Sequence, residues 1–90
     1  MLLYRACWLR DQGETAEMEV AMAKIAVSEA AVKSSLEAIQ IFGGIGYMSE
    51  FGVERYLRDS RVHRILEGTN EIMRVIIARR ILLADSQAIL

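Results

Sequence analysis

The sequence predicts an all-α protein, an up-and-down antiparallel helical bundle of three helices and the stub of a fourth. Apolar residues recur at steps of three and four through the middle of the chain, which is the spacing of one helical face. There is no proline to break such helices. No stretch alternates apolar and polar residues with the period of two that is typical of a half-buried strand.

The composition limits the class of function. Of the 90 residues 53% are hydrophobic, a surplus that favours surfaces meant for a partner or for further domains. The formal net charge of −1, with both signs interspersed, gives no electrostatic case for binding nucleic acid or a membrane. No signal peptide or membrane-spanning run is present, so the protein is expected to be soluble and intracellular.

The single cysteine, Cys7, excludes an intramolecular disulfide and a cysteine-rich metal site. Its neighbours are apolar, which favours a buried, inert thiol. The lone histidine, His63, lies among arginines without other metal-ligand residue types nearby, so it is expected at the surface or in an interface. No metal site is expected.

Two helices are predicted before residue 42. The first covers Leu2 to about Gln12 and ends at Gly13 in a left-handed cap. It begins without a cap at residue 1, which favours a fragment of a longer protein. The second covers Glu14 to about Ile41, and Glu29 interrupts its apolar face. That face is formed by Met18, Met22, Ile25, Val32, Leu36 and Ile39, and beside it runs a stripe of small residues with Ala16, Ala23, Ala26 and Ala30.

Gly43, Gly44 and Gly46 end the second helix, and two interpretations stay open. A C-cap followed by a turn explains one or two glycines well. Three glycines in four residues also fit a ligand, such as a phosphate or nucleotide, that approaches the backbone closely. The setting is not the strand-to-helix turn of a dinucleotide-binding G-x-G-x-x-G motif, which favours the first interpretation.

A third helix is predicted from Gly52 to Leu66, with ion pairs Glu54–Arg58 and Arg55–Asp59 on a solvated face. The fourth runs from Asn70 to about Ala84 after the segment Ile65-Leu-Glu-Gly-Thr-Asn-Glu-Ile-Met-Arg74.

Within that segment Gly68 permits a sharp bend and Thr69 is a typical N-cap. Glu67, just before them, has two interpretations: its carboxylate satisfies free N–H groups of the helix, or it acts as a base on something bound there. Acidic residues are common at helix starts, which favours the first.

Three motifs occur in a fixed order: Gln40-Ile-Phe-Gly-Gly-Ile-Gly-Tyr47, then Val53-Glu-Arg-Tyr-Leu-Arg-Asp59, then Glu67-Gly-Thr69. In this order and at these separations they closely resemble the C-terminal end of the acyl-CoA dehydrogenases. The resemblance covers nearly the whole chain and is strongest from Gln40 to Arg80. The amino-acid sequence around Glu67 looks most like that of the short branched-chain, isobutyryl-type members.

The resemblance implies that residues 1–90 are part of the C-terminal four-helix bundle, without the N-terminal helical and middle β-domains. It implies an FAD-dependent enzyme that converts an acyl-CoA to a trans-2-enoyl-CoA. Glu67 would be the base that removes the proton alpha to the thioester carbonyl, and Gly68 would lie against the substrate. The backbone N–H of Glu67 and a flavin hydroxyl would polarise the thioester oxygen.

The resemblance also assigns the cofactor contacts and the partners. Thr69, Asn70 and Glu71 would touch the FAD of the same subunit. The FAD of a neighbouring subunit would be contacted by Gln40, Ile41, Phe42, Gly43 and Gly44. This implies a homodimer or tetramer, with an electron-transfer flavoprotein as electron acceptor. The location would be the cytoplasm in a bacterium or the mitochondrial matrix in a eukaryote.

The match is not complete. Gly52 stands where many members have proline, and Arg58 with Asp59 would be a structural pair. Because the flavin-wrapping domain is missing, the 90 residues alone are expected to be inactive. The alternative is a non-enzymatic helical module that oligomerises through its apolar faces. A nucleic-acid-binding relative is disfavoured by the near-neutral charge.

Overall fold

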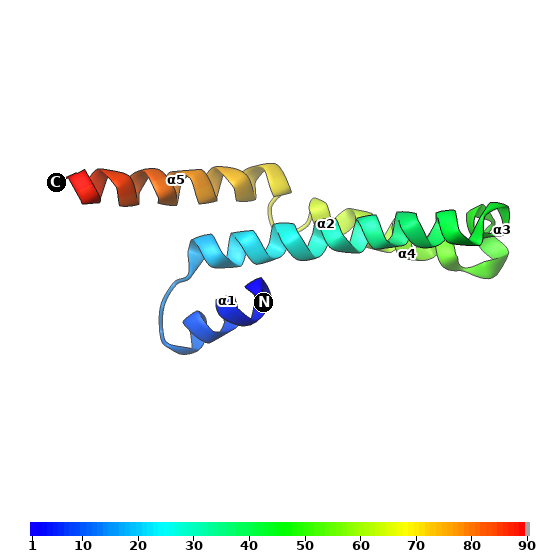
Figure 1. Cartoon of the computed structure of the whole chain (residues 1–90), viewed down its shortest axis with the longest axis horizontal. Helices are drawn as coiled ribbons and strands as arrows, with labels where there is room; N and C mark the ends of the chain where they lie inside the picture. Colours follow the sequence, from blue (N-terminus) through cyan, green and yellow to red (C-terminus); the bar gives the residue numbers. More distant parts are fainter. Residues whose placement is uncertain (90) are drawn as a thin grey trace. The chain divides into compact units, whose positions relative to one another are not determined.

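The computed structural model describes the backbone of residues 1–89 and the side chains of residues 1–84. Within these residues there is no strand, so the all-α class is confirmed. Figure 1 shows the helices in chain order, each labelled where space allows. Their bounds are α1 Leu2–Asp11, α2 Glu17–Phe42, α3 Gly44–Tyr47, η1 Ser49–Phe51, α4 Val53–Arg61, η2 Val62–Arg64 and α5 Asn70–Ile89.

The chain divides into two compact units, and the long helix α2 contributes to both. The first unit contains Met1–Ala26 together with the chain from Gly68 onward. In it Glu17 pairs with Arg80 at 3.9 Å, while Lys24, further along α2, contacts Asn70 at the start of α5. Because a later position on α2 meets an earlier position on α5, these two helices run antiparallel. In Figure 1, α1 and α5 lie on opposite sides of the first half of α2.

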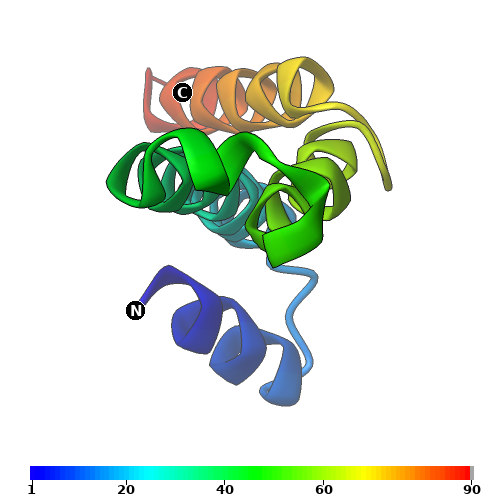
Figure 2. The ribbon, with the colours of Figure 1, turned by 90° about the vertical axis from the view of Figure 1, so that its right-hand side faces the viewer.

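The second unit, Val27–Glu67, pairs the rest of α2 with α4. The hydroxyls of Ser35 and Ser60 lie 3.3 Å apart, and Arg64 Nε lies 3.1 Å from a carboxylate oxygen of Glu29. This order is again antiparallel. The ion pair also explains why Glu29 interrupts the apolar face of α2: its half-buried carboxylate faces a guanidinium rather than a hydrocarbon. Figure 2 views this unit from its α3 end.

The first helix ends where the sequence predicts. Gly13 adopts φ +85°, its N–H donates to the carbonyl of Arg10, and the N–H of Glu14 donates to the carbonyl of Leu9. This pair of bonds is a Schellman cap. Arg10 also donates to the carbonyl of Thr15. These bonds hold residues 14 and 15 in the connection, and Ala16 has a left-handed φ of +50°, so α2 begins at Glu17 and not at Glu14 as predicted.

The second helix ends one residue beyond the prediction, and a short helix that was not predicted follows it. Gly43 has φ +72° and donates its N–H to the carbonyls of Ile39 and Gln40. The chain then makes one more helical turn, α3, in which Gly46 is buried. A Cβ on Gly46 would lie 2.7 Å from Phe42 Cβ and 2.8 Å from the carbonyl oxygen of Ile39. Gly46 is therefore required because the chain packs against its own helix.

The third helix is shorter than the predicted span Gly52–Leu66. Its α-helical part ends at Arg61, and the 3₁₀ turn η2 and a further turn occupy the rest. The N–H groups of Ile65 and Leu66 both donate to the carbonyl of Val62, at 2.9 Å each, which tightens the chain into a turn. Of the two predicted ion pairs on α4, Arg58–Glu54 forms at 2.6 Å.

The core of the described residues is small. Its members are Ala6, Ala16, Ala21, Ala23 and Val32, with Ser28 and Asn70 as buried polar residues. The predicted apolar face of α2 is buried at Val32 and half-buried at four further positions, but Leu36 is exposed. In the small-residue stripe Ala16 and Ala23 are buried, whereas Ala26 and Ala30 are exposed. Narrow side chains let helices approach closely and leave long apolar side chains outside the contact.

Two single residues test the sequence predictions directly. The prediction that Cys7 is buried is wrong: it is exposed, because α1 buries only Ala6 and leaves the apolar neighbours of Cys7 in solvent as well. His63 is exposed, as predicted. In the part of the chain that the structure describes, no helix is long and apolar enough to cross a membrane.

The glycines of the α2–α3 connection provide a test of the fold. Gly46→Ala is expected to destabilise the protein by about 1–3 kcal/mol, because the new methyl overlaps the backbone of α2. Gly44→Ala is the matched control, since a Cβ there meets nothing within 4 Å. Urea unfolding followed by circular dichroism measures both. Equal midpoints for the two variants would contradict the packing described for Gly46.

Candidate functional site

The turn between η2 and α5 places Glu67 in a backbone conformation that glutamate rarely adopts. Glu67 has φ +59° and Gly68 has φ +86°, so two successive residues are left-handed. The left-handed conformation costs an L-residue with a side chain about 1–2 kcal/mol, whereas glycine adopts it freely. Glu67 is exposed. Non-glycine residues held in this way are concentrated at functional sites.

Thr69 caps the helix that follows. Its hydroxyl oxygen accepts the N–H of Ile72 at 3.2 Å, and its carbonyl accepts the N–H of Met73 at 3.0 Å, the first bond of α5. The predicted N-cap is therefore confirmed. Among the described residues no hydrogen bond or ion pair engages the Glu67 carboxylate. The capping role that residue chemistry favoured for Glu67 belongs to Thr69, and the carboxylate is available for another role.

Lys24, on α2, holds the residues that follow Glu67. Its ammonium nitrogen lies 2.9 Å from the carbonyl oxygen of Gly68 and 2.5 Å from Oδ1 of Asn70. Asn70 is 1% exposed, and a buried polar side chain needs a partner inside the protein. Lys24 supplies that partner for its side-chain oxygen. Sequence reasoning missed Lys24, because a lysine on a predicted helix carries no local signal of a partner 44 residues away.

The predicted cofactor residues form two contiguous groups in the chain. Thr69, Asn70 and Glu71 begin α5, where Thr69 is half-buried, Asn70 buried and Glu71 exposed. Gln40–Gly44 cover the end of α2 and the first residue of α3, and all five residues are exposed, with Ile41 at 83%. A Cβ on Gly44 would meet open space, so neither packing nor a positive φ in this structure requires glycine there. A ligand or partner that approaches the backbone closely would explain why residue 44 is glycine.

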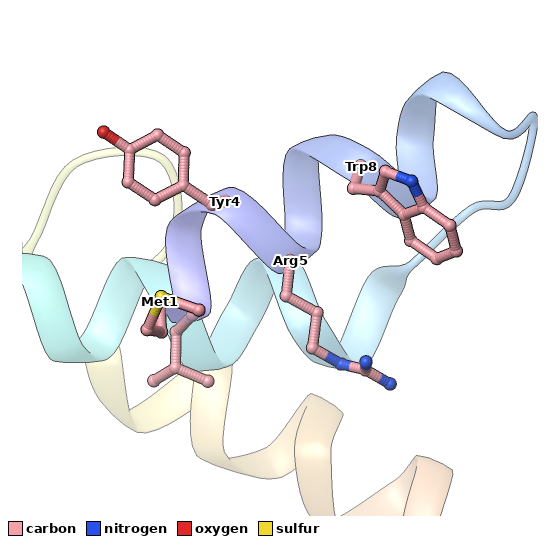
Figure 3. A pocket seen from close by; sticks show the side chains of 5 residues that line it. Met1, Tyr4, Arg5 and Trp8 are labelled. Carbon is pink, nitrogen blue, oxygen red and sulfur yellow. The ribbon is translucent and has the colours of Figure 1, made fainter.

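A hollow on α1 lies outside every predicted site. It is lined by Met1, Leu2, Tyr4, Arg5 and Trp8, which all come from the first residue and the first helix (Figure 3). Since one helix supplies the whole lining, the hollow is a surface concavity without the converging polar groups of a ligand pocket. Within the described residues no group of three or more His, Cys, Asp and Glu side chains is placed to hold a metal ion.

The strained backbone predicts an unusual mutational effect. Glu67→Gly is expected to raise the free energy of unfolding by about 1 kcal/mol, because glycine accepts φ +59° without the Cβ clash. The same substitution at Glu37, which is exposed and lies inside α2 more than one turn from its end, is expected to lower it by about 1 kcal/mol. Urea denaturation measures both, and a loss of stability at both positions would contradict the conformation described for Glu67.

Comparison with known proteins shows which family the chain resembles. The family described as acyl-CoA dehydrogenase, C-terminal domain, matches residues 1–82. An acyl-CoA dehydrogenase of Bacillus subtilis is 51% identical over 81 residues, covering 90% of this chain and 21% of that protein. An L-prolyl-[peptidyl-carrier protein] dehydrogenase of a Serratia species is 49% identical over 81 residues with the same shares. The human mitochondrial short-chain specific acyl-CoA dehydrogenase is 49% identical over 82 residues, 91% of this chain and 20% of that protein.

Solved structures agree with these relatives. The FAD complex of PigA matches with a TM-score of 0.85 and 49% identity, over 92% of this chain and 22% of that one. The butyryl-CoA dehydrogenase of Megasphaera elsdenii matches with a TM-score of 0.86 and 37% identity, over 90% and 21%. The chain thus spans about a fifth of the length of the relatives it matches. It belongs to the acyl-CoA dehydrogenase family, as a C-terminal domain.

Proposed function

We propose that this chain supplies the catalytic base and part of the flavin-binding surface of an FAD-dependent acyl-CoA dehydrogenase. The observation that carries the proposal is Glu67, whose carboxylate has no partner among the described residues and whose backbone is held left-handed beside a capped helix. Two relatives that are similar over most of this chain are acyl-CoA dehydrogenases, which supports the enzyme class. The reaction is alpha,beta-dehydrogenation of an acyl thioester.

In this proposal each residue of the turn has its own role toward the substrate. The Glu67 carboxylate takes the proton from the carbon alpha to the thioester carbonyl, a weak acid whose conjugate base must be stabilised as it forms. The backbone N–H of Glu67 donates to the thioester oxygen, and Gly68, which has no side chain, lies against the acyl group. Bound FAD supplies the acceptor for the hydride from the beta carbon.

The residues proposed to hold FAD fit a nucleotide by their chemistry. The start of α5 offers backbone N–H groups and a positive dipole end, which favour anionic and carbonyl groups. Gly44 leaves open space beside its backbone, and the exposed side chains of Ile41 and Phe42 offer apolar contact. The FAD complex of PigA, similar over 92% of this chain, supports FAD as the cofactor.

The partners follow from the same family membership. We propose a homodimer or tetramer in which Gln40–Gly44 reach the flavin of a neighbouring subunit, and an electron-transfer flavoprotein as acceptor. One similar solved chain comes from work on the electron transferring flavoprotein of Acidaminococcus fermentans. We further propose a short branched acyl-CoA as substrate, with isobutyryl-CoA the first to assay. Catalysis needs the flavin-wrapping part of the complete enzyme, so the described residues alone are expected to be inactive.

The role of Glu67 is tested in the complete enzyme. Glu67→Gln is expected to lower the rate of flavin reduction by acyl-CoA by about 10²–10⁴-fold, because the amide cannot accept the proton. FAD content, measured from the flavin absorbance after gel filtration, is expected to stay at the wild-type level. Glu37→Gln, on the exposed face of α2, is the control. Undiminished flavin reduction in Glu67→Gln would refute the base assignment, and absence of flavin from wild type would favour the non-enzymatic module.

The glycine loop is tested separately. Gly44→Leu is expected to reduce FAD retention, because its side chain fills the space that the proposed nucleotide uses. The unfolding midpoint of the flavin-free protein is expected to stay close to that of wild type, because Gly44 is exposed and its Cβ direction leads into open space. Equilibrium dialysis with FAD and thermal unfolding give the two quantities. Wild-type FAD affinity in Gly44→Leu would argue against a nucleotide at this loop.

A further inference from the structure

Lys24 makes a contact that the proposed chemistry does not use. It lies on α2, is half-buried, and bonds two acceptors that follow Glu67 in the chain: the carbonyl oxygen of Gly68 and Oδ1 of Asn70. The other lysine of the sequence, Lys33, lies on the same helix and is exposed. Lys24 is thus a cation placed on the backbone beside the proposed base.

The position of Lys24 matters because it bonds the residue of the turn that has no side chain to restrain its backbone. Gly68 has no Cβ, and at φ +86° it can rotate its peptide plane at little steric cost. Thr69 fixes the chain on the helical side, through the N–H of Ile72. Lys24 fixes the carbonyl of Gly68 itself, and charge-assisted hydrogen bonds are roughly twice as strong as neutral ones.

Asn70 provides the second anchor. It is the largest fully buried side chain of the described residues, at 1% exposure, and it begins α5. Its bond to Lys24 joins the first residue of α5 to the first third of α2. The ammonium group of Lys24 therefore fixes both the carbonyl of Gly68, the residue after Glu67, and Asn70, the first residue of α5.

We propose that Lys24 is a positioning residue for the base: by holding the Gly68 carbonyl and Asn70, it fixes the backbone that carries the Glu67 carboxylate and N–H toward the substrate. The proposal rests on the proposed function of Glu67. Without Lys24 the Gly68 peptide samples other orientations, and the base spends less time aligned with the alpha carbon. Misplacement of a reacting group by about 1 Å can lower a rate by about 100-fold.

The test uses Lys24→Met, which keeps an unbranched side chain but has no charge or donor, and Lys33→Met as the matched control. The first measurement is amide hydrogen exchange in the flavin-free protein. Segments covering residues 68–73 are expected to exchange at least about tenfold faster in Lys24→Met, because a charge-assisted bond that holds the turn is lost. Exchange over α4 and in Lys33→Met is expected to match wild type.

The second measurement is made on the flavin-loaded complete enzyme. The rate constant of flavin reduction per bound FAD is expected to fall by about 10- to 100-fold in Lys24→Met, with little change in KM. The isotope effect with alpha-deuterated substrate is expected to rise, since proton removal becomes more rate-limiting. Lys24→Arg, which keeps a cation with several donors, is expected to recover part of the rate.

The outcomes separate this proposal from the one on which it rests. Wild-type exchange at residues 68–73 and a wild-type rate per flavin in Lys24→Met would overturn the positioning role. A loss confined to folded or flavin-loaded fraction, with the rate per flavin and isotope effect unchanged, would make Lys24 purely structural and also overturn it. If Glu67→Gln keeps full turnover, the base assignment fails whatever the exchange data show at Lys24.

Discussion

Polar contacts made by α2 are the constraint on which its pairing with α4 and with α5 depends. The apolar core is too small to fix the pairing of helices by itself, because its members are mostly alanines. Lys24 holds the start of α5, Glu29 faces Arg64 and Ser35 faces Ser60. Each contact joins residues at least 25 positions apart in the chain. Half-buried charges and hydroxyls need specific partners, so these contacts fix the register of the pairings within each unit.

The features that could be predicted from the sequence are those set by local chemistry. The stop at Gly13 follows from a left-handed cap that glycine tolerates, and the start at Asn70 follows from the hydroxyl of Thr69. The all-α class follows from the apolar spacing. Helix ends set by competing hydrogen bonds were placed less well. The end of α4 depends on a shared acceptor at Val62, a detail that periodicity does not encode.

The candidate site divides in the same way. Glu67, Gly68 and Thr69 were found from sequence because a motif and a cap coincide there. Lys24 was not, because its partners become its neighbours only when α2 and α5 pair antiparallel. Cys7 was misplaced for the related reason that apolar neighbours on a helix do not ensure a covering surface. For the three glycines the two sequence interpretations apply to different residues: Gly43 and Gly46 are explained by the backbone, while Gly44 is not.

The turn at Glu67 links stability to the proposed chemistry. A glutamate at φ +59° costs the fold about 1–2 kcal/mol, a large part of the margin available to a chain with so small a core. The Thr69 cap offsets about 1 kcal/mol, and the bonds of Lys24 contribute on the same side. The hydrogen bonds that start α5 are therefore the ones that hold the backbone of the residues directly after Glu67. Glycine would cost the fold less than glutamate at this position, and a base requires a carboxylate, so in the proposed function this backbone strain is the cost of the chemistry.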